Sequence, residues 1–220
     1  MICTLHREDV AATLGREHEA ARRQREERIA TAEAGSPPIS SRDFRTSEVH
    51  RTSYLSIGPR QGKFLYGAAR ACGARTIVEF GSSFGISTIY LAAAASDNGG
   101  TVTGSEFHAE KVAKATQNLA DAGLSGVAAI RGGDAQERLA DIEGPIDLLF
   151  LDGAKELYLP ILRMLEDRLK PGALVIADNA DMLTEEEGSF LHHVGAERQR
   201  YVTTLIGFNK GLMSHSLFLG

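Results

Sequence analysis

The fold of this chain is decided by the stretch VEFGSSFGIST, residues 78–88. An apolar run ends at Glu79 and Phe80, and Gly81 and Gly85 bracket the short polar loop that follows. Glycines at these two points let the chain turn sharply and let a ligand approach the backbone. The loop also opens a predicted helix, whose first N–H groups would face that ligand. The stretch therefore predicts the first strand, loop and helix of a nucleotide-binding α/β domain.

Outward from this stretch, apolar runs alternate with amphipathic ones, which is the pattern of parallel strands joined by crossover helices. The last two runs flank a turn at residues 209–211 and predict an antiparallel hairpin instead. We therefore predict an α/β fold, a doubly wound, mostly parallel seven-stranded sheet of the Rossmann-like kind with a C-terminal antiparallel hairpin. The expected strands are 76–80, 101–106, 127–130, 146–152, 173–177, 200–206 and 212–219, the expected helices are 86–95, 109–122, 136–140 and 157–169, and Pro171-Gly172 is expected to be a turn.

The first 50 residues differ from the rest of the chain. Residues 7–34 are rich in Ala, Glu and Arg and predict a helix with few apolar positions to bury, which Gly35-Ser36-Pro37-Pro38 would end. Arginines at positions 22, 23, 25 and 28 alternate with glutamates, and we interpret them as a solvated helix face. We thus predict an N-terminal helical arm and linker over residues 1–50 and the main domain over residues 51–220.

Composition narrows the class of protein. The 220 residues, 43% of them hydrophobic, suffice for one α/β domain with a proper core. A net charge of −5 argues against a nucleic-acid partner, and no apolar run approaches the roughly 18 residues that a membrane helix needs. Cys3 and Cys72 are too few for a disulfide scaffold, and the polar first ten residues lack a signal peptide's apolar core. We expect a cytoplasmic protein without a nucleic-acid or membrane partner.

Acidic residues stand at or just past the end of each predicted parallel strand, where an open α/β sheet binds its ligand. Glu106 ends the second strand, and its carboxylate can accept hydrogen bonds from both ribose hydroxyls of an adenosyl group. Ser83 stands where a dinucleotide site would want its middle glycine for the approach of a pyrophosphate. Together these two residues favour an adenosine ligand without a pyrophosphate.

The turn Gly133-Asp134-Ala135-Gln136 follows the third strand. Such a turn can bind an adenine edge through backbone N–H groups and the Asp134 carboxylate. Asp134 is equally well suited to cap the next helix, because aspartate is a favoured N-cap residue, and the two roles can coexist.

The ends of two further strands indicate the reaction. Asp152, Asp178 and Asn179 offer hard oxygen ligands of the kind that suit Mg²⁺. Lys155 follows three residues after Asp152, and a lysine beside a divalent cation has its charged form disfavoured, so it could remove a proton from a substrate hydroxyl. The alternative interpretation is that Lys155 is a surface residue and Asp178 caps a turn. Tyr158 is interpreted as a packing residue of its helix.

The chain resembles the cation-dependent O-methyltransferases of the catechol O-methyltransferase type. VEFGSSFGIST is similar to their first cofactor motif, LDGAKELYLP (151–160) to their metal and base motif, and ADN (177–179) to their second metal motif. GSFLHHVG (188–195) is similar to the helix that follows the second metal motif. The segment that begins at Gly58 is similar in spacing to the helix that leads into the first strand of these enzymes. The resemblance covers about residues 55–219.

This resemblance implies a class I methyltransferase fold and, as cofactors, S-adenosylmethionine and Mg²⁺. It implies that Asp152, Asp178 and Asn179 hold the metal and that Lys155, beside Asp152, is the catalytic base. The implied cofactor-binding residues are Glu79, Gly81, Ser83, Ser87, Glu106, Gly133, Asp134, Ala135, Gln136 and Asp152.

The chain departs from the catechol enzymes at Gly153, where they carry a bulkier residue, and around residues 208–212, which lack an acidic residue. The match is closer to a bacterial branch of small enzymes that act on diverse acceptors, often secondary metabolites. The expected function is methyl transfer to the hydroxyl of a small molecule. We expect a homodimer, with the N-terminal arm either at the dimer interface or over the acceptor site.

Three alternatives stay open at this point. The first is a metal-independent small-molecule N- or O-methyltransferase, in which Asp178 and Asn179 would bind only substrate. The second is a non-catalytic, cofactor-binding partner protein. The third is a nicotinamide dehydrogenase, which Ser83 argues against.

Overall fold

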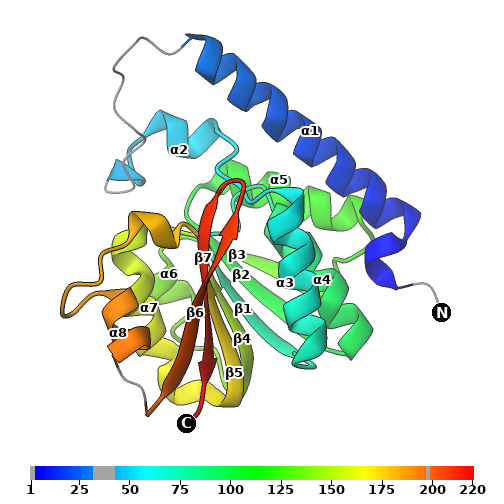
Figure 1. Ribbon diagram of the computed structural model, residues 1–220. Coiled ribbons are helices and arrows are strands. Elements are labelled where there is room, and N and C mark those ends of the chain that lie inside the picture. The colour runs from blue at the N-terminus through cyan, green and yellow to red at the C-terminus, as the bar shows by residue number, and fades with distance from the viewer. Residues whose placement is uncertain (1–2, 32–42, 197–198) are drawn as a thin grey trace.

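The computed structural model describes residues 3–31, 43–196 and 199–220. Its centre is one seven-stranded sheet in the order β3-β2-β1-β4-β5-β7-β6 (Figure 1). The first five strands along the chain run parallel, and β7 pairs antiparallel with both β5 and β6. The predicted doubly wound, mostly parallel seven-stranded sheet and its C-terminal antiparallel hairpin are therefore confirmed. The strands are β1 (Thr76–Phe80), β2 (Thr101–Glu106), β3 (Ala128–Gly132), β4 (Ile146–Leu151), β5 (Leu169–Ala177), β6 (Tyr201–Phe208) and β7 (Gly211–Phe218).

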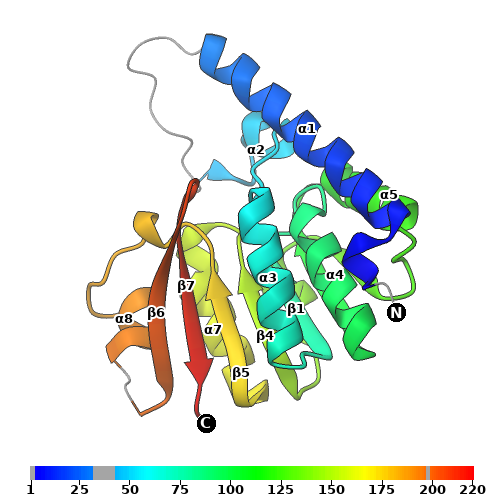
Figure 2. The same ribbon diagram turned by 45° about the vertical axis from the view of Figure 1, so that its right-hand side comes forward.

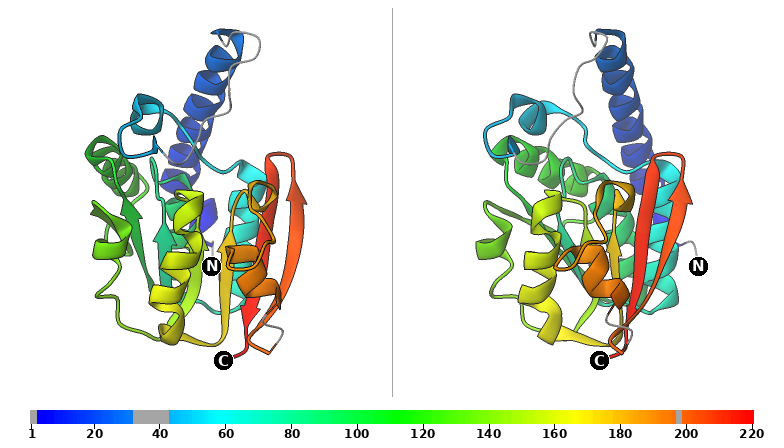
Figure 3. Two further views of the ribbon diagram at one scale, coloured as in Figure 1. Left: turned by 90° about the vertical axis from the view of Figure 1, so that its left-hand side faces the viewer. Right: turned by 60° about the vertical axis from the view of Figure 1, so that its left-hand side comes forward.

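Helices cover both faces of the sheet (Figures 2 and 3). Alternate residues of the strands point to opposite faces, so Ile77 packs with the helices of one side and Val78 with those of the other. The first side holds α1 (Glu8–Thr31), α3 (Pro59–Ala71), α4 (Ile86–Asn98) and α5 (Ala109–Asp121), and the second holds α6 (Ala135–Arg138), α7 (Tyr158–Leu165) and α8 (Phe190–Ala196). The short helix α2 (Glu48–Thr52) lies near the ends of the parallel strands (Figure 1).

The N-terminal helix α1 packs on its own chain through its first half. Val10 and Leu14 are buried in the same core as Leu65 of α3, whereas Ile29 near the other end is 63% exposed. The helix thus crosses above the ends of the parallel strands with its second half reaching past the domain (Figure 2). The division of the chain near residue 50 stays a prediction, and the expected break at residues 35–38 lies outside the described residues.

Two expected elements differ from the structure. The turn at Pro171-Gly172 is wrong, because both residues lie inside β5, beside a shift in its register with β4. Gly172 has a positive φ of 89° there. A Pro-Gly pair is typical of turns because glycine adopts such angles easily, so the sequence alone predicts a chain reversal. The single helix expected over residues 157–169 is instead α7, which lies between two 3-10 turns, Lys155–Leu157 and Glu166–Arg168. Leu169, expected to end that helix, is the first residue of β5.

No helix among the described segments is both long and apolar enough to cross a lipid bilayer.

Candidate active site

A cavity of about 540 Å³ opens at the carboxyl ends of the parallel strands. It brings together most of the residues that the sequence singled out, namely Gly81, Ser83, Glu106, Gly133, Asp134, Ala135, Asp152, Lys155, Asp178 and Asn179. Glu79, Ser87 and Gln136 are not among its lining residues. The cavity therefore has a first part at β1, β2 and β3 and a second part at β4 and β5.

The loop after β1 is shaped by three residues with positive φ, namely Gly81, Ser83 and Gly85. Gly81 has a φ of 90°, and a Cβ there would lie 2.6 Å from the Cα of Gly153 in the loop after β4, so the two backbones touch. Ser83 has a φ of 48° and donates its N–H to Glu106 Oε2 at 2.9 Å. Its hydroxyl is buried, lines the cavity and has no hydrogen-bond partner among the described residues. A polar ligand in the cavity would supply that partner.

Glu79 lies beneath this loop and is fully buried. Burial raises the pKa of its carboxyl, although the hydroxyls of Ser82 and Thr88 donate hydrogen bonds to its Oε2 and the nearby Ser87 hydroxyl acts in the same direction as these bonds. Ser87 is directed to Glu79 in this arrangement. The two residues therefore hold the β1–α4 loop from behind, which explains why neither lines the cavity.

Glu106 faces the cavity at the end of β2. Its two carboxylate oxygens accept the N–H groups of Ser83 and His108, both at 2.9 Å. Each oxygen keeps a further lone pair, so the carboxylate is oriented yet able to accept hydroxyl donors from a ligand. This geometry suits the ribose of an adenosyl group.

Asp134 has two partners at the next strand end. Its carboxylate accepts the N–H of Gln136 at 3.0 Å and so caps α6, which is the alternative that the sequence left open. It also forms a 2.7 Å ion pair with Arg45, which lowers its pKa. Phe44 reaches the same place, since its carbonyl lies 2.9 Å from His108 Nε2 and its ring packs edge-on against Phe107.

Sequence reasoning missed this contribution of residues 44 and 45, because it assigned them to a linker. No local pattern marks them, since their partners are 64 and 89 residues away in the chain. Sequence reasoning also missed Lys111 of α5, which lines the cavity although it is only 3% exposed. Burial lowers the pKa of Lys111, and the negative charges of Glu106 and Asp152 act in the opposite direction.

The second part of the cavity holds two buried carboxylates. Burial and the neighbouring Asp178 raise the pKa of Asp152 well above its usual range, and burial raises the pKa of Asp178. Gln61 of α3 donates from Nε2 to Asp178 Oδ1 at 2.7 Å, while its Oε1 accepts the N–H of Gly58 at 2.8 Å. Gln61 is 1% exposed, so its amide is fixed and orients Asp178. No local pattern marks this role, because Gln61 and Asp178 are 117 residues apart in the chain.

Lys155 follows β4 and faces Asp152. Its Nζ lies 3.8 Å from Asp152 Oδ1 and donates to the Gly153 carbonyl at 3.0 Å and to the Tyr158 hydroxyl at 2.9 Å. Tyr158 is fully buried between Phe80 and Phe190, and its hydroxyl donates to the Asp178 carbonyl at 3.2 Å. The expectation that Tyr158 is a packing residue is right, and its hydroxyl also connects Lys155 with the end of β5.

The structure gives a physical reason for glycine at position 153. A Cβ on this residue would lie 2.3–2.7 Å from three atoms of the Phe80 ring. Phe80 of β1 therefore already fills the space into which a side chain at position 153 would project, and it lines the cavity there.

The donor set at the second part suits a divalent cation in its chemistry. It consists of two buried carboxylates beside one another and the Asn179 amide, and a cation would relieve the repulsion between the carboxylates. Across the part of the chain that the structure describes, no three His, Cys, Asp or Glu side chains converge on one point as a metal site. Any metal bound here would thus need Asn179, water or substrate to complete its coordination.

Comparisons with known proteins agree with this geometry. A family model described as a methyltransferase domain matches residues 78–180. The chain is 36% identical over 129 residues to a catechol O-methyltransferase of Niastella koreensis, which covers 57% of this chain and 58% of that protein. It is 31% identical over 146 residues to a catechol O-methyltransferase of Mycobacterium tuberculosis, with 66% of each covered.

The matched part of the chain thus spans less than two thirds of the length of these two curated relatives. Over nearly the whole chain, the fold is similar to that of the O-methyltransferase from Bacillus cereus, solved in complex with SAH. The TM-score is 0.65 at 22% identity, and the match covers 91% of this chain and 99% of that one.

Proposed function

We propose that this chain transfers a methyl group from S-adenosylmethionine to a hydroxyl of a small molecule, assisted by Mg²⁺. The match of residues 78–180 to a methyltransferase-domain model and the 36% identity over 129 residues to a catechol O-methyltransferase support the proposal. One observation carries the proposal: residues suited to an adenosyl group and residues suited to a divalent cation line the same cavity. Two reactants held side by side react as if in one molecule, an effect worth about 7–11 kcal/mol in favourable cases.

The first part of the cavity would bind the cofactor. The unpartnered hydroxyl of Ser83 and the backbone at Gly81 are available to its methionine end, and Glu106 to the ribose hydroxyls. Asp134 and Ala135 would contact the adenine, and Arg45 would hold Asp134 in place. The similarly folded O-methyltransferase from Bacillus cereus was solved in complex with SAH, which supports the proposal of an adenosyl ligand.

The second part would bind the acceptor. Asp152, Asp178 and Asn179 would hold Mg²⁺, which when bound acts as a Lewis acid and a template for the acceptor oxygen. Gln61 would orient Asp178 for this task. Lys155 Nζ would take the hydroxyl proton, and Tyr158 would fix its position through the 2.9 Å contact.

The first part of the test is methyl transfer itself. Purified full-length protein, S-adenosylmethionine and Mg²⁺ are incubated with a panel of small phenols and diols, and methylated product is measured by mass spectrometry. We expect product with at least one acceptor, and EDTA should abolish it. Turnover that EDTA leaves unchanged would instead support a metal-independent methyltransferase, and cofactor binding without transfer to any acceptor would support a non-catalytic partner protein.

The second part of the test concerns the residues. Asp152→Ala and Asn179→Ala should lose both Mg²⁺ affinity, measured by calorimetry, and turnover. Lys155→Met should lose turnover while still binding Mg²⁺. The matched control is Lys63→Met, a change at an exposed lysine of α3 away from the cavity. Equal loss in Lys63→Met and Lys155→Met would contradict a role for Lys155 as the base.

The state of assembly is a further proposal. We propose a homodimer, in keeping with the expectation for the N-terminal arm, and light scattering of the full chain tests it. A monomer mass at concentrations above those of the assay would contradict it.

A further inference from the structure

One face of α1 borders the cavity. Ala21, Arg25 and Arg28 all line it, and their spacing of four and then three residues places them along one side of a helix. Gln24 anchors this part of α1 to the main domain, because it accepts the N–H of Tyr54 at 2.6 Å and donates to the Thr52 carbonyl at 3.1 Å. The part of α1 around residues 21–28 is therefore held at the edge of the cavity, while its last residues project past the domain.

The arginines of this helix fall into two groups. Arg22 and Arg23 form ion pairs with Glu19, and Arg22 also pairs with Glu26, as expected of a solvated face. Arg25 and Arg28 instead line the cavity, and within residues 3–31, 43–196 and 199–220 neither forms an ion pair. All four arginines are exposed, as expected of a solvated helix face, and Arg25 and Arg28 in addition border the cavity.

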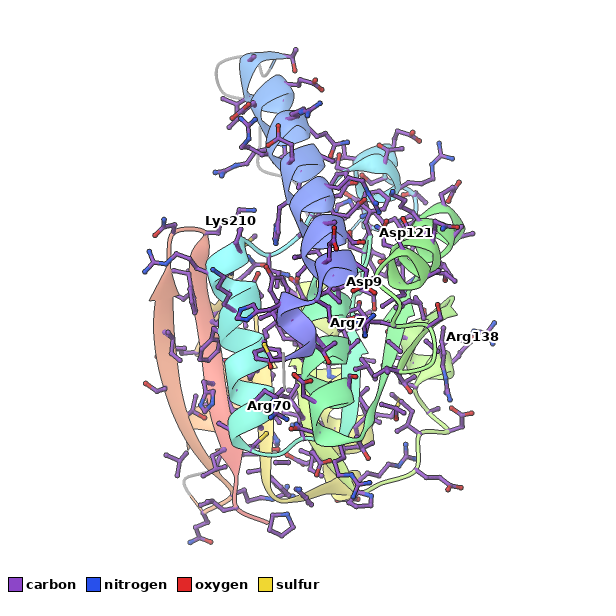
Figure 4. The ribbon with its side chains drawn as sticks, turned by 90° about the vertical axis from the view of Figure 1, so that its right-hand side faces the viewer. Arg7, Asp9, Arg70, Asp121, Arg138 and Lys210 are labelled. Carbon is purple, nitrogen blue, oxygen red and sulfur yellow. The ribbon has the colours of Figure 1, made fainter. Side chains whose placement is uncertain are left out.

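A third cation approaches from the hairpin. Lys210 lies at the tip between β6 and β7 (Figure 4), lines the cavity and donates from Nζ to the Ser56 carbonyl at 3.3 Å. Burial and the charge of Arg25 lower its pKa, while the charges of Asp178 and Asp152 act in the opposite direction. Lys210 therefore lies within electrostatic reach both of Arg25 and of the two carboxylates at the second part of the cavity.

We propose that Arg25, Arg28 and Lys210 bind an oxyanion on the acceptor, so that the natural substrate is a hydroxylated small molecule that also carries a carboxylate or a phosphate. This inference rests on the proposed methyl transfer and names the substrate class for it. The reacting hydroxyl lies at Asp152 and Asp178, and the anion lies at the opposite end of the molecule, beneath α1.

The charges favour this assignment over a neutral acceptor. The three positively charged side chains at the edge of the cavity repel one another. An oxyanion bound between them would attract each one and offset this repulsion. Arginine presents donors in a planar fork that matches carboxylate and phosphate oxygens. Asp181 also lines the cavity, but its Oδ1 accepts the N–H of Leu212 at 2.8 Å and its charge acts on Asp178. Among the residues that the structure describes, Asp181 forms no ion pair with Arg25, Arg28 or Lys210, so the three cations stay available to a ligand.

The experiment measures binding, so that it does not depend on catalysis. The full-length protein, with S-adenosylhomocysteine and Mg²⁺ present, is titrated by calorimetry with three diols that differ in one group. These are 3,4-dihydroxybenzoate, 3,4-dihydroxybenzyl phosphate and the neutral 3,4-dihydroxybenzyl alcohol. We expect at least one anionic diol to bind about tenfold more tightly than the alcohol, and the stronger of the two identifies the oxyanion.

Variants locate the effect. In Arg25→Gln combined with Lys210→Gln, we expect the ratio of the anionic to the neutral affinity to collapse to within about threefold of one. Arg22→Gln is the matched control, because it removes an arginine from the outward side of the same helix, and the ratio should persist there. Raising the NaCl concentration should weaken binding of the anionic diol more than that of the alcohol.

Three outcomes would overturn the inference: equal affinity for all three diols, no binding of any of them, or a ratio that persists in the double variant. Failure of methyl transfer is a separate result, since the titrations are made with the demethylated cofactor. Tight, variant-sensitive binding of an anionic diol without turnover would uphold the anion site and refute the proposed activity.

Discussion

Replacing Gln61 with leucine tests whether α3 orients the proposed metal ligand Asp178. The change removes the 2.7 Å hydrogen bond to Asp178 Oδ1 and the 2.8 Å hydrogen bond that Gln61 accepts from the N–H of Gly58. Gln61 is 1% exposed, and leucine has a similar volume without a polar atom, so packing should change little.

The two lost bonds have different consequences. The N–H of Gly58 at the start of α3 loses its acceptor, which should lower the free energy of unfolding by about 1 kcal/mol. Asp178 loses a partner that holds its carboxylate in place, and removal of such a partner lowers metal affinity about 10- to 100-fold, equal to about 1.4–2.7 kcal/mol. The larger effect should thus fall on Mg²⁺ binding.

Calorimetric titration with Mg²⁺ and urea unfolding of the same preparations separate these effects. The matched control is Lys63→Leu, an exposed position of the same helix, which should change neither quantity. If Gln61→Leu lost about 1 kcal/mol of stability but kept its Mg²⁺ affinity within about twofold, the reasoning would be refuted, and Gln61 would be only a helix cap.

Three further predictions concern Tyr158, Gly153 and Glu17. Tyr158→Phe removes the hydroxyl oxygen that accepts a hydrogen bond from Lys155 Nζ. Steady-state kinetics should therefore show a kcat about tenfold lower and a nearly unchanged KM for S-adenosylmethionine. A change in KM alone would contradict this. Gly153→Ala places a Cβ against the Phe80 ring and should cost about 1–3 kcal/mol in urea unfolding, a loss that Phe80→Leu should partly restore, whereas additive losses would count against the contact. Burial alone would raise the pKa of Glu17, but hydrogen bonds from Tyr54, Arg16 and Lys114 hold it below its ordinary value of 4.5. Its carboxylate therefore stabilises the fold above pH 4.5 and loses that effect as the pH falls through the lower folded value, so the stability difference between the wild type and Glu17→Gln should shrink in acid, and a difference independent of pH would refute this.

The sequence determined the strands and helices of the main domain well. Residues 76–80 and 101–106 were predicted with the bounds of β1 and β2, and the hairpin was found within one or two residues. Hydrophobic periodicity and glycine positions are local properties, so they can be read without the fold. The carboxyl ends of parallel strands meet at one edge, and this rule alone brought Glu106, Asp152 and Asp178 to one cavity.

The same local reading failed where the chain's conformation depends on a neighbour. Pro171-Gly172 resembles a turn in isolation, yet pairing with β4 keeps both residues inside β5. Glu79 and Ser87 belong to the cofactor motif, yet the folded loop directs them toward each other and away from the cavity.

What only the tertiary structure decided is which distant side chains complete the cavity. Gln61 reaches Asp178, and Arg45 reaches Asp134, across 117 and 89 residues of chain, and periodicity carries no information about such pairs. The spacing of the arginines along α1 follows from the sequence. The packing of the helix on the main domain decides which of them face the cavity. Gln24 sets that rotation, so Arg22 meets solvent and glutamates while Arg25 meets the cavity.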